Sequence, residues 1–116
     1  MSAFSQPEID VSPARVAELH EAREVQLVDV REPYEHEAGR IAGARHLPLE
    51  RLASQAESLD RDRPVVFQCR LGSRSAMAAQ AFRASGWDAY SLDGGIAAWV
   101  EAGLPIEPQD GHVADH

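Results

Sequence analysis

The sequence contains a single cysteine and no lysine, asparagine or threonine. A lone cysteine cannot form an internal disulfide, which fits a reducing compartment. Without lysine, Schiff-base chemistry and a Walker-type phosphate loop are excluded, because both use a lysine amine. The absence of asparagine excludes N-linked glycosylation.

Long apolar runs and a positive net charge are also missing. No apolar run approaches the roughly 20 residues that a membrane-spanning helix needs. Residues 1–10 contain neither the basic nor the apolar segment of a secretory signal. The formal net charge is −8, whereas nucleic acids and anionic membranes bind clustered positive charge. We therefore expect a cytoplasmic protein with no nucleic-acid partner and no membrane partner.

The length and composition are those of one small globular domain. The chain has 116 residues, of which 44% are hydrophobic and 26% are charged. We place the domain in residues 1–107 and expect the polar residues 108–116 to form a frayed C-terminal tail. His112 and His116 in this tail have the i, i+4 spacing of metal ligands, but no third ligand accompanies them. We therefore expect no metal site.

Strand-like and helix-like segments alternate along the chain. Short apolar runs predict strands, and helical periodicity with start and stop residues predicts helices between them. The run 64–69 is almost entirely apolar and predicts a central strand. The other expected strands are 25–30, 44–48 and 88–92, and the expected helices are 13–22, 32–39, 49–59, 73–86 and one from 94 that stops at Gly103. This alternation predicts an α/β fold with a mainly parallel sheet and helices on both of its faces.

The single cysteine, Cys69, ends the run 64–69 and begins the sequence CRLGSRS, which leads into an alanine-rich helix. In such folds ligands bind at the carboxyl ends of the strands, where backbone N–H groups and a helix N-terminus stabilise thiolates and anions. Arg70 and Arg74 add positive charge, and Gly72 permits a tight loop. This context favours a reactive thiolate over the alternative, a small buried apolar residue.

Other residues near the predicted site have two interpretations each. Asp29 and Arg31, at the end of the strand 25–30, are expected to form a pair that braces loops, with direct catalysis as the alternative. Gly94 and Gly95 either give backbone clearance at a helix start or line the substrate entrance. No histidine lies near Cys69 in the sequence, so a cysteine–histidine pair of the protease type has no support. The acidic residues are interpreted as a solvated surface.

Three motifs follow one another at characteristic spacing: DVREPYEHEAGRIAGARHLP at 29–48, CRLGSR at 69–74 followed by Ser75, and LDGGIAAWVEAGLP at 92–105. With these motifs the chain resembles a single-domain rhodanese, a sulfurtransferase, from about residue 9 to residue 107. The resemblance implies a three-layer α/β/α fold with a five-stranded, mainly parallel sheet. It also implies that Cys69 takes a sulfane sulfur from a small anionic donor as a persulfide. A thiophilic acceptor such as cyanide or a thiol then receives the sulfur, and no metal or organic cofactor is needed.

Carried onto this sequence, the resemblance assigns the site residue by residue. Cys69 is the sulfur carrier, and the loop after it supplies the substrate cradle. The cradle residues are Arg70, Leu71, Gly72, Ser73 and Arg74. Beside this assignment, we count Asp29, Arg31 and Ser75 as supporting residues. Backbone N–H groups of the loop would stabilise the partial negative charge of the persulfide, and the arginines would hold the anionic end of thiosulfate.

The loop length and two departures from the family pattern bear on the substrate. Four residues separate Cys69 from Arg74, whereas related phosphatases and arsenate reductases have one residue more between their cysteine and arginine. Ser75 therefore stands at the position of their arginine. Leu71 is apolar where thiosulfate-specialised members tend to have a second basic residue, but mercaptopyruvate-specialised loops lack an arginine at the position of Arg70. Arg40 stands where members often have histidine, and we assign it no role. Thiosulfate is therefore the favoured donor.

Two alternatives stay open beside the sulfurtransferase. One is a persulfide carrier or binding module that passes sulfur to a protein acceptor with little turnover of its own. The other is a small-anion phosphatase or arsenate reductase, which the short loop disfavours.

Overall fold

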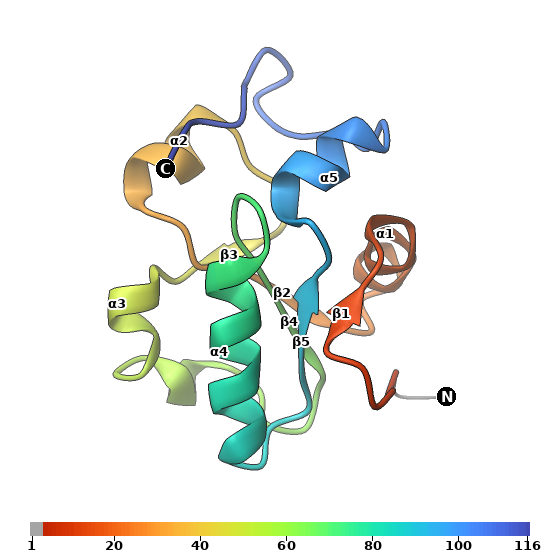
Figure 1. The fold of residues 1–116 in the computed structure, drawn as a ribbon, viewed down its shortest axis with the longest axis vertical. Helices are drawn as coiled ribbons and strands as arrows, with labels where there is room; N and C mark the ends of the chain where they lie inside the picture. The colour runs from red at the N-terminus through yellow and green to blue at the C-terminus, as the bar shows by residue number, and fades with distance from the viewer. Residues whose placement is uncertain (1–3) are drawn as a thin grey trace.

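The computed structural model describes residues 4–116, and a five-stranded sheet lies at its centre (Figure 1). The strands are β1 (Asp10–Val11), β2 (Gln26–Asp29), β3 (Arg45–His46), β4 (Val65–Gln68) and β5 (Ala89–Leu92). They lie in the order β1-β5-β4-β2-β3, and every pairing between them is parallel. The predicted parallel sheet is confirmed, with β4 as its central strand.

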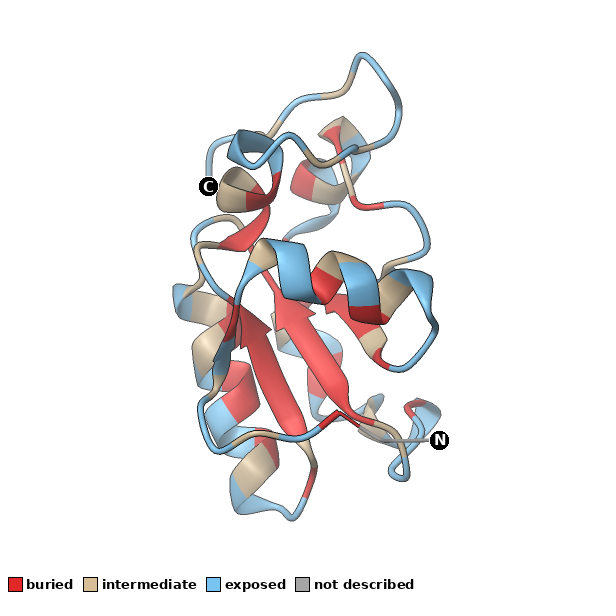
Figure 2. Cartoon of the chain, turned by 90° about the vertical axis from the view of Figure 1, so that its right-hand side faces the viewer, coloured by how far each residue is buried: buried red, intermediate tan, exposed pale blue. Residues whose placement is uncertain are grey.

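Helices cover both faces of the sheet. They are α1 (Pro13–Glu21), α2 (Pro33–Ala38), α3 (Leu49–Leu52), α4 (Ser73–Ala84) and α5 (Gly95–Glu101), with a short 3₁₀ helix at Ala56–Ser58. α1 and α5 pack on one face through a cluster that includes Leu19 and Trp99, and α3 and α4 pack on the other through Leu52 and Phe82. Figure 2 shows the buried strands enclosed by helices whose outer sides are exposed. The three-layer α/β/α fold is therefore confirmed.

Local sequence accounts for several element boundaries. The Ser12 hydroxyl accepts a hydrogen bond from the N–H of Arg15 at 3.3 Å, and Pro13 occupies the first turn, so α1 begins where the sequence predicts. α4 ends just before Gly86, which has a φ of 89°. A left-handed residue there is the common way to end a helix, and glycine adopts it without steric cost.

Two parts of the predicted secondary structure differ from the observed fold. The expected helix 49–59 is divided into α3 and the 3₁₀ helix, and the Ser54 hydroxyl donates to the carbonyl of Arg51 at the break. The division lets both Leu52 and Leu59 reach the same core cluster. β1 was not identified from the pattern, because two residues are too few to show a strand period.

The register of the sheet places two predicted site segments beside each other. Asp29 at the end of β2 is paired with Gln68 at the end of β4, and the N–H of Val30 donates to the carbonyl of Gln68 at 3.0 Å. Cys69 follows Gln68 directly, so the site lies at the carboxyl ends of the two strands, as expected for this fold. None of the helices in the described part of the chain is long and apolar enough to cross a membrane.

Candidate active site

The thiol of Cys69 is buried at the start of the loop between β4 and α4, with 1% of the residue exposed. Its Sγ accepts hydrogen bonds from the N–H groups of Gly72 at 3.1 Å and Ser75 at 3.4 Å. Gly72 has a φ of 108°, a left-handed conformation that favours glycine and folds the loop back over the sulfur. The predicted convergence of backbone donors on Cys69 is therefore present, at the N-terminus of α4.

Two buried hydroxyls form a chain of contacts that reaches the sulfur. The Ser75 Oγ lies 3.4 Å from the Cys69 Sγ and 2.7 Å from the Oγ of Ser91, and both serines are fully buried. Ser91 lies in β5, between Tyr90 and Leu92. A serine within a buried apolar strand is the one sequence signal that could have identified it, because buried hydroxyls need a partner.

The N-terminus of α5 holds the loop from the opposite side. The N–H of Ile96 donates to the carbonyl of Cys69 at 2.8 Å, and that of Ala97 donates to the carbonyl of Arg70 at 3.1 Å. A Cβ on Gly95 would lie 2.4 Å from the Arg70 oxygen, and Gly95 has a φ of 66°. Of the two interpretations for the glycine pair, backbone clearance therefore holds for Gly95.

Arg74 pairs with Glu35 of α2. Its Nη1 and Nη2 donate to the two carboxylate oxygens at 2.9 and 3.0 Å, and the Glu35 side chain is completely buried. Burial raises the pKa of Glu35, but the hydrogen bonds and charge of Arg74, with the N–H of Glu32, hold that pKa below its usual value. The Glu35 hydrogen bonds raise the pKa of Arg74. The expectation of a solvated acidic surface is wrong for Glu35, because the first turn of α2 carries this carboxylate under the loop.

A spacing in the sequence could have indicated Glu35. The residue stands three positions after Glu32, the N-cap of α2, and the two form a capping box in which the Glu32 N–H donates to Glu35 at 2.9 Å. The box predicts a helix start at Pro33 but does not predict burial. The pairing with Arg74 consequently required the fold.

Asp29 and Arg31 form a fully buried ion pair at the end of β2. Arg31 donates its Nε to Oδ1 at 2.9 Å and its Nη2 to Oδ2 at 2.8 Å, and the same Nη2 donates to the carbonyl of Gly39. His36 Nδ1 lies 2.8 Å from Asp29 Oδ2. Burial raises the pKa of Asp29, but the hydrogen bonds and charge of Arg31, with His36, lower it below its usual value. Through the bond to Gly39 the pair joins β2 to the end of α2.

The remaining cradle residues line a small hollow. It has a volume of about 150 Å³ and is lined by Arg70, Leu71, Ser73, Arg74 and His116. Arg70 donates to the Asp115 carboxylate at 3.0 Å, and 31% of its side chain is exposed. Both loop arginines line the hollow, but Arg74 is paired with the buried Glu35, whereas Arg70 is paired with the exposed Asp115. The ion pair of Arg70 is therefore the weaker one.

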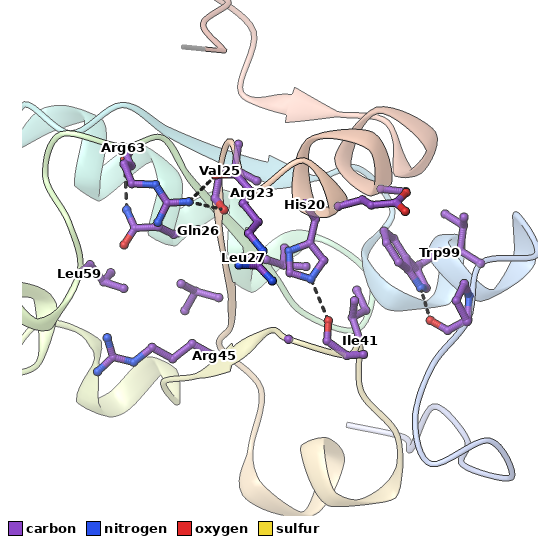
Figure 3. A pocket seen from close by; sticks show the side chains of 17 residues that line it. His20, Arg23, Val25, Gln26, Leu27, Ile41, Arg45, Leu59, Arg63 and Trp99 are labelled. Atoms are coloured by element: carbon purple, nitrogen blue, oxygen red, sulfur yellow. Dashed lines mark hydrogen bonds between the residues drawn. The ribbon is translucent and has the colours of Figure 1, made fainter. Parts of the chain in front are cut away.

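A larger cavity of about 880 Å³ lies away from the thiol, around the first residues of β2 (Figure 3). Its lining includes the apolar residues Leu27, Ile41 and Trp99 and the basic residues Arg45 and Arg63. None of the residues 69–75 lines it. The loop chemistry is consequently separate from the larger cavity.

Comparison with known proteins identifies the family. The family model described as "Rhodanese-like domain" matches residues 12–102. The thiosulfate sulfurtransferase GlpE of Shewanella oneidensis is 40% identical over 103 residues, which cover 88% of this chain and 98% of that protein. The uncharacterised protein YqhL of Bacillus subtilis is 44% identical over 78 residues, which cover 66% of this chain and 62% of that protein.

A solved structure agrees with these relatives. The rhodanese-related protein of Thermoplasma volcanium has a TM-score of 0.78 and 31% identity, covering 84% of this chain and 95% of its own. The family and the relatives named as sulfurtransferases support a sulfurtransferase activity in general. The chain belongs to the rhodanese-like domain family.

Proposed function

We propose that Cys69 carries a sulfane sulfur, as a persulfide, from thiosulfate to a thiophilic acceptor such as cyanide or a thiol. The observation that carries the proposal is the convergence of the Gly72 and Ser75 N–H groups on the Cys69 sulfur, at 3.1 and 3.4 Å. Such preorganised donors stabilise negative charge where it forms during reaction. The GlpE relative bears the name of a thiosulfate sulfurtransferase, which supports the same donor.

The reaction takes place in two displacement steps. The Cys69 thiolate attacks the outer sulfur of thiosulfate, the S–S bond breaks, and sulfite leaves with the bonding electron pair. Cyanide then attacks the outer sulfur of the persulfide, thiocyanate leaves, and the thiolate is regenerated. Both steps balance without an oxidant, a reductant or a proton, so the proposal requires no metal or organic cofactor.

Two features of the loop support sulfur transfer over phosphate chemistry. Ser75 stands where the longer phosphatase loop has arginine. The position beside the Cys69 sulfur is therefore filled by the buried, uncharged hydroxyl of Ser75 instead of a guanidinium. Arg74 is held by Glu35 in a two-point ion pair. Arg70 is therefore the cationic group we assign to the anionic end of the donor.

The direct test is the mass of the intact protein after incubation with thiosulfate. We expect one added sulfur atom, its removal by cyanide, and no addition in Cys69→Ala. A Cys69 that never gains a cyanide-labile sulfur with any sulfane donor would refute the proposal. Cys69→Ala replaces a buried residue of the core, so its circular dichroism spectrum must match that of the parent for the comparison to hold.

A second candidate is a persulfide carrier for a protein acceptor. It is favoured by the exposure of Leu71 (61%) and Met77 (60%), two large apolar side chains in the loop and in α4. Rapid persulfide exchange with a protein thiol, together with slow turnover of thiosulfate and cyanide, would support it. Met77→Gln, in α4 and away from the hollow, should then slow the exchange with the protein and leave persulfide formation from thiosulfate within about twofold.

A further inference from the structure

The segment after α5 runs back along α2 to the loop between β4 and α4. The backbones of Arg40 and Glu107 bond to each other twice, at 2.7 and 2.9 Å, and the N–H of His112 donates to the carbonyl of Ala38 at 3.0 Å. Figure 1 shows the C-terminal residues beside α2, above the loop between β4 and α4. Residues 108–116, which we call the tail segment, are thus placed against the site.

The position of the tail segment depends on two glycines, Gly39 and Gly111. A Cβ on Gly39 would lie 2.4 Å from the His112 oxygen, and a Cβ on Gly111 would lie 2.7 Å from the Ala38 oxygen. Gly39 has a φ of 178°, which is extended backbone that any residue adopts. Space rather than conformation therefore demands glycine at both positions, because any side chain there would push the tail segment away from α2.

The tail segment ends its path on Arg70. The Tyr34 hydroxyl of α2 donates to the backbone carbonyl of Asp115 at 3.0 Å, and the Asp115 carboxylate accepts from Arg70 Nη2 at 3.0 Å. The Asp115 side chain is 92% exposed, so this ion pair is weak and an anion in solution is able to replace it. The carboxylate of Asp115 is thus paired with the arginine that we assign to the anionic donor.

We propose that Asp115 is a specificity-determining residue that competes with the anionic sulfur donor for Arg70. The proposal rests on the function proposed above, in which Arg70 holds the donor. The carboxylate offsets part of the positive charge of Arg70 and so lowers the affinity of the hollow for anionic donors relative to uncharged ones. For an exposed pair we expect an effect of about two- to fivefold.

The first experiment measures the entrance charge without any sulfur transfer. Cys69 is alkylated with iodoacetate, which is anionic, and with iodoacetamide, which is neutral. The rate with iodoacetate divided by the rate with iodoacetamide is then compared between each variant and the parent. Asp115→Asn should raise this ratio about two- to fivefold, because the anionic reagent gains the free guanidinium. Gly111→Ala, which displaces the tail segment from α2, should change it in the same direction.

Two control variants make the result specific. Asp110→Asn removes the same charge from the tail segment at an exposed position for which the described residues give no ion pair, and it should leave the ratio unchanged. In an Arg70→Ala background, Asp115→Asn should have no effect. An equal rise in Asp110→Asn and Asp115→Asn, or a rise in both alkylation rates alike, would overturn the proposal in favour of a general charge or a steric cover.

The second experiment uses thiosulfate:cyanide turnover. Asp115→Asn should lower the KM for thiosulfate about two- to fivefold and leave kcat unchanged, because the competition affects donor binding and not the sulfur atom. An unchanged KM alongside an unchanged alkylation ratio refutes the role of Asp115. Absent turnover with a changed alkylation ratio refutes the proposed function alone, so the two failures are distinguishable.

Discussion

Replacement of Glu35 by glutamine should destabilise the protein while leaving it folded. Glutamine keeps one acceptor oxygen for Arg74 and the Glu32 N–H, but its NH₂ group meets an Arg74 donor where a carboxylate oxygen now accepts at 3.0 Å. Breaking a buried pair by removing one partner costs about 3–5 kcal/mol, and the loss of one charged hydrogen bond about 1.5–3 kcal/mol. Since 16% of the Arg74 side chain stays exposed, we expect about 3 kcal/mol.

Urea unfolding followed by circular dichroism measures this loss. A chain of 116 residues has an expected unfolding free energy of about 6–17 kcal/mol, so Glu35→Gln should still fold, with a melting temperature about 10 °C lower. The double variant Glu35→Gln, Arg74→Met removes both charges and should lose less than the sum of the two single variants. A loss below 1 kcal/mol in Glu35→Gln, or strict additivity in the cycle, would refute the view that Arg74 is neutralised by Glu35.

Two further predictions concern the loop contact with α5 and the response to acid. Gly95→Ala should lower the free energy of unfolding by about 2–4 kcal/mol and impair sulfur transfer, because its Cβ would lie 2.4 Å from the Arg70 oxygen. Gly103→Ala is the control, since Gly103 has a similar φ of 82° but open space around it. Equal losses of unfolding free energy in urea for the two variants would contradict the clash. The folded-state pKa values of Asp29 and Glu35 lie below their usual values of 3.8 and 4.5. The stability that they contribute is therefore fully present above about pH 4.5 and is lost as the pH falls through their folded-state values. Unfolding free energies that stay constant from pH 5 to pH 3 would contradict this assignment.

The sequence alone was sufficient for the parts of the protein that depend on neighbouring residues. Apolar runs such as 64–69 predict buried strands because a strand covered on both faces has no polar side to alternate with. The contiguous sequence CRLGSRS predicts the loop around Cys69, since its N–H donors and its left-handed Gly72 belong to one short segment. The short β1 was not predicted, and the expected helix 49–59 was too long, because neither has enough local pattern to fix it.

Only the tertiary structure decided which distant residues meet at the site. Arg74 pairs with Glu35, Ser75 contacts Ser91, and Arg70 pairs with Asp115, at sequence separations of 39, 16 and 45 residues. Whether a carboxylate is solvated or buried depends on what packs over it, and the sequence around Glu35 does not contain that information. The loop around Cys69 is consequently a property of the sequence, whereas the charge balance at Arg70 and Arg74 is a property of the fold.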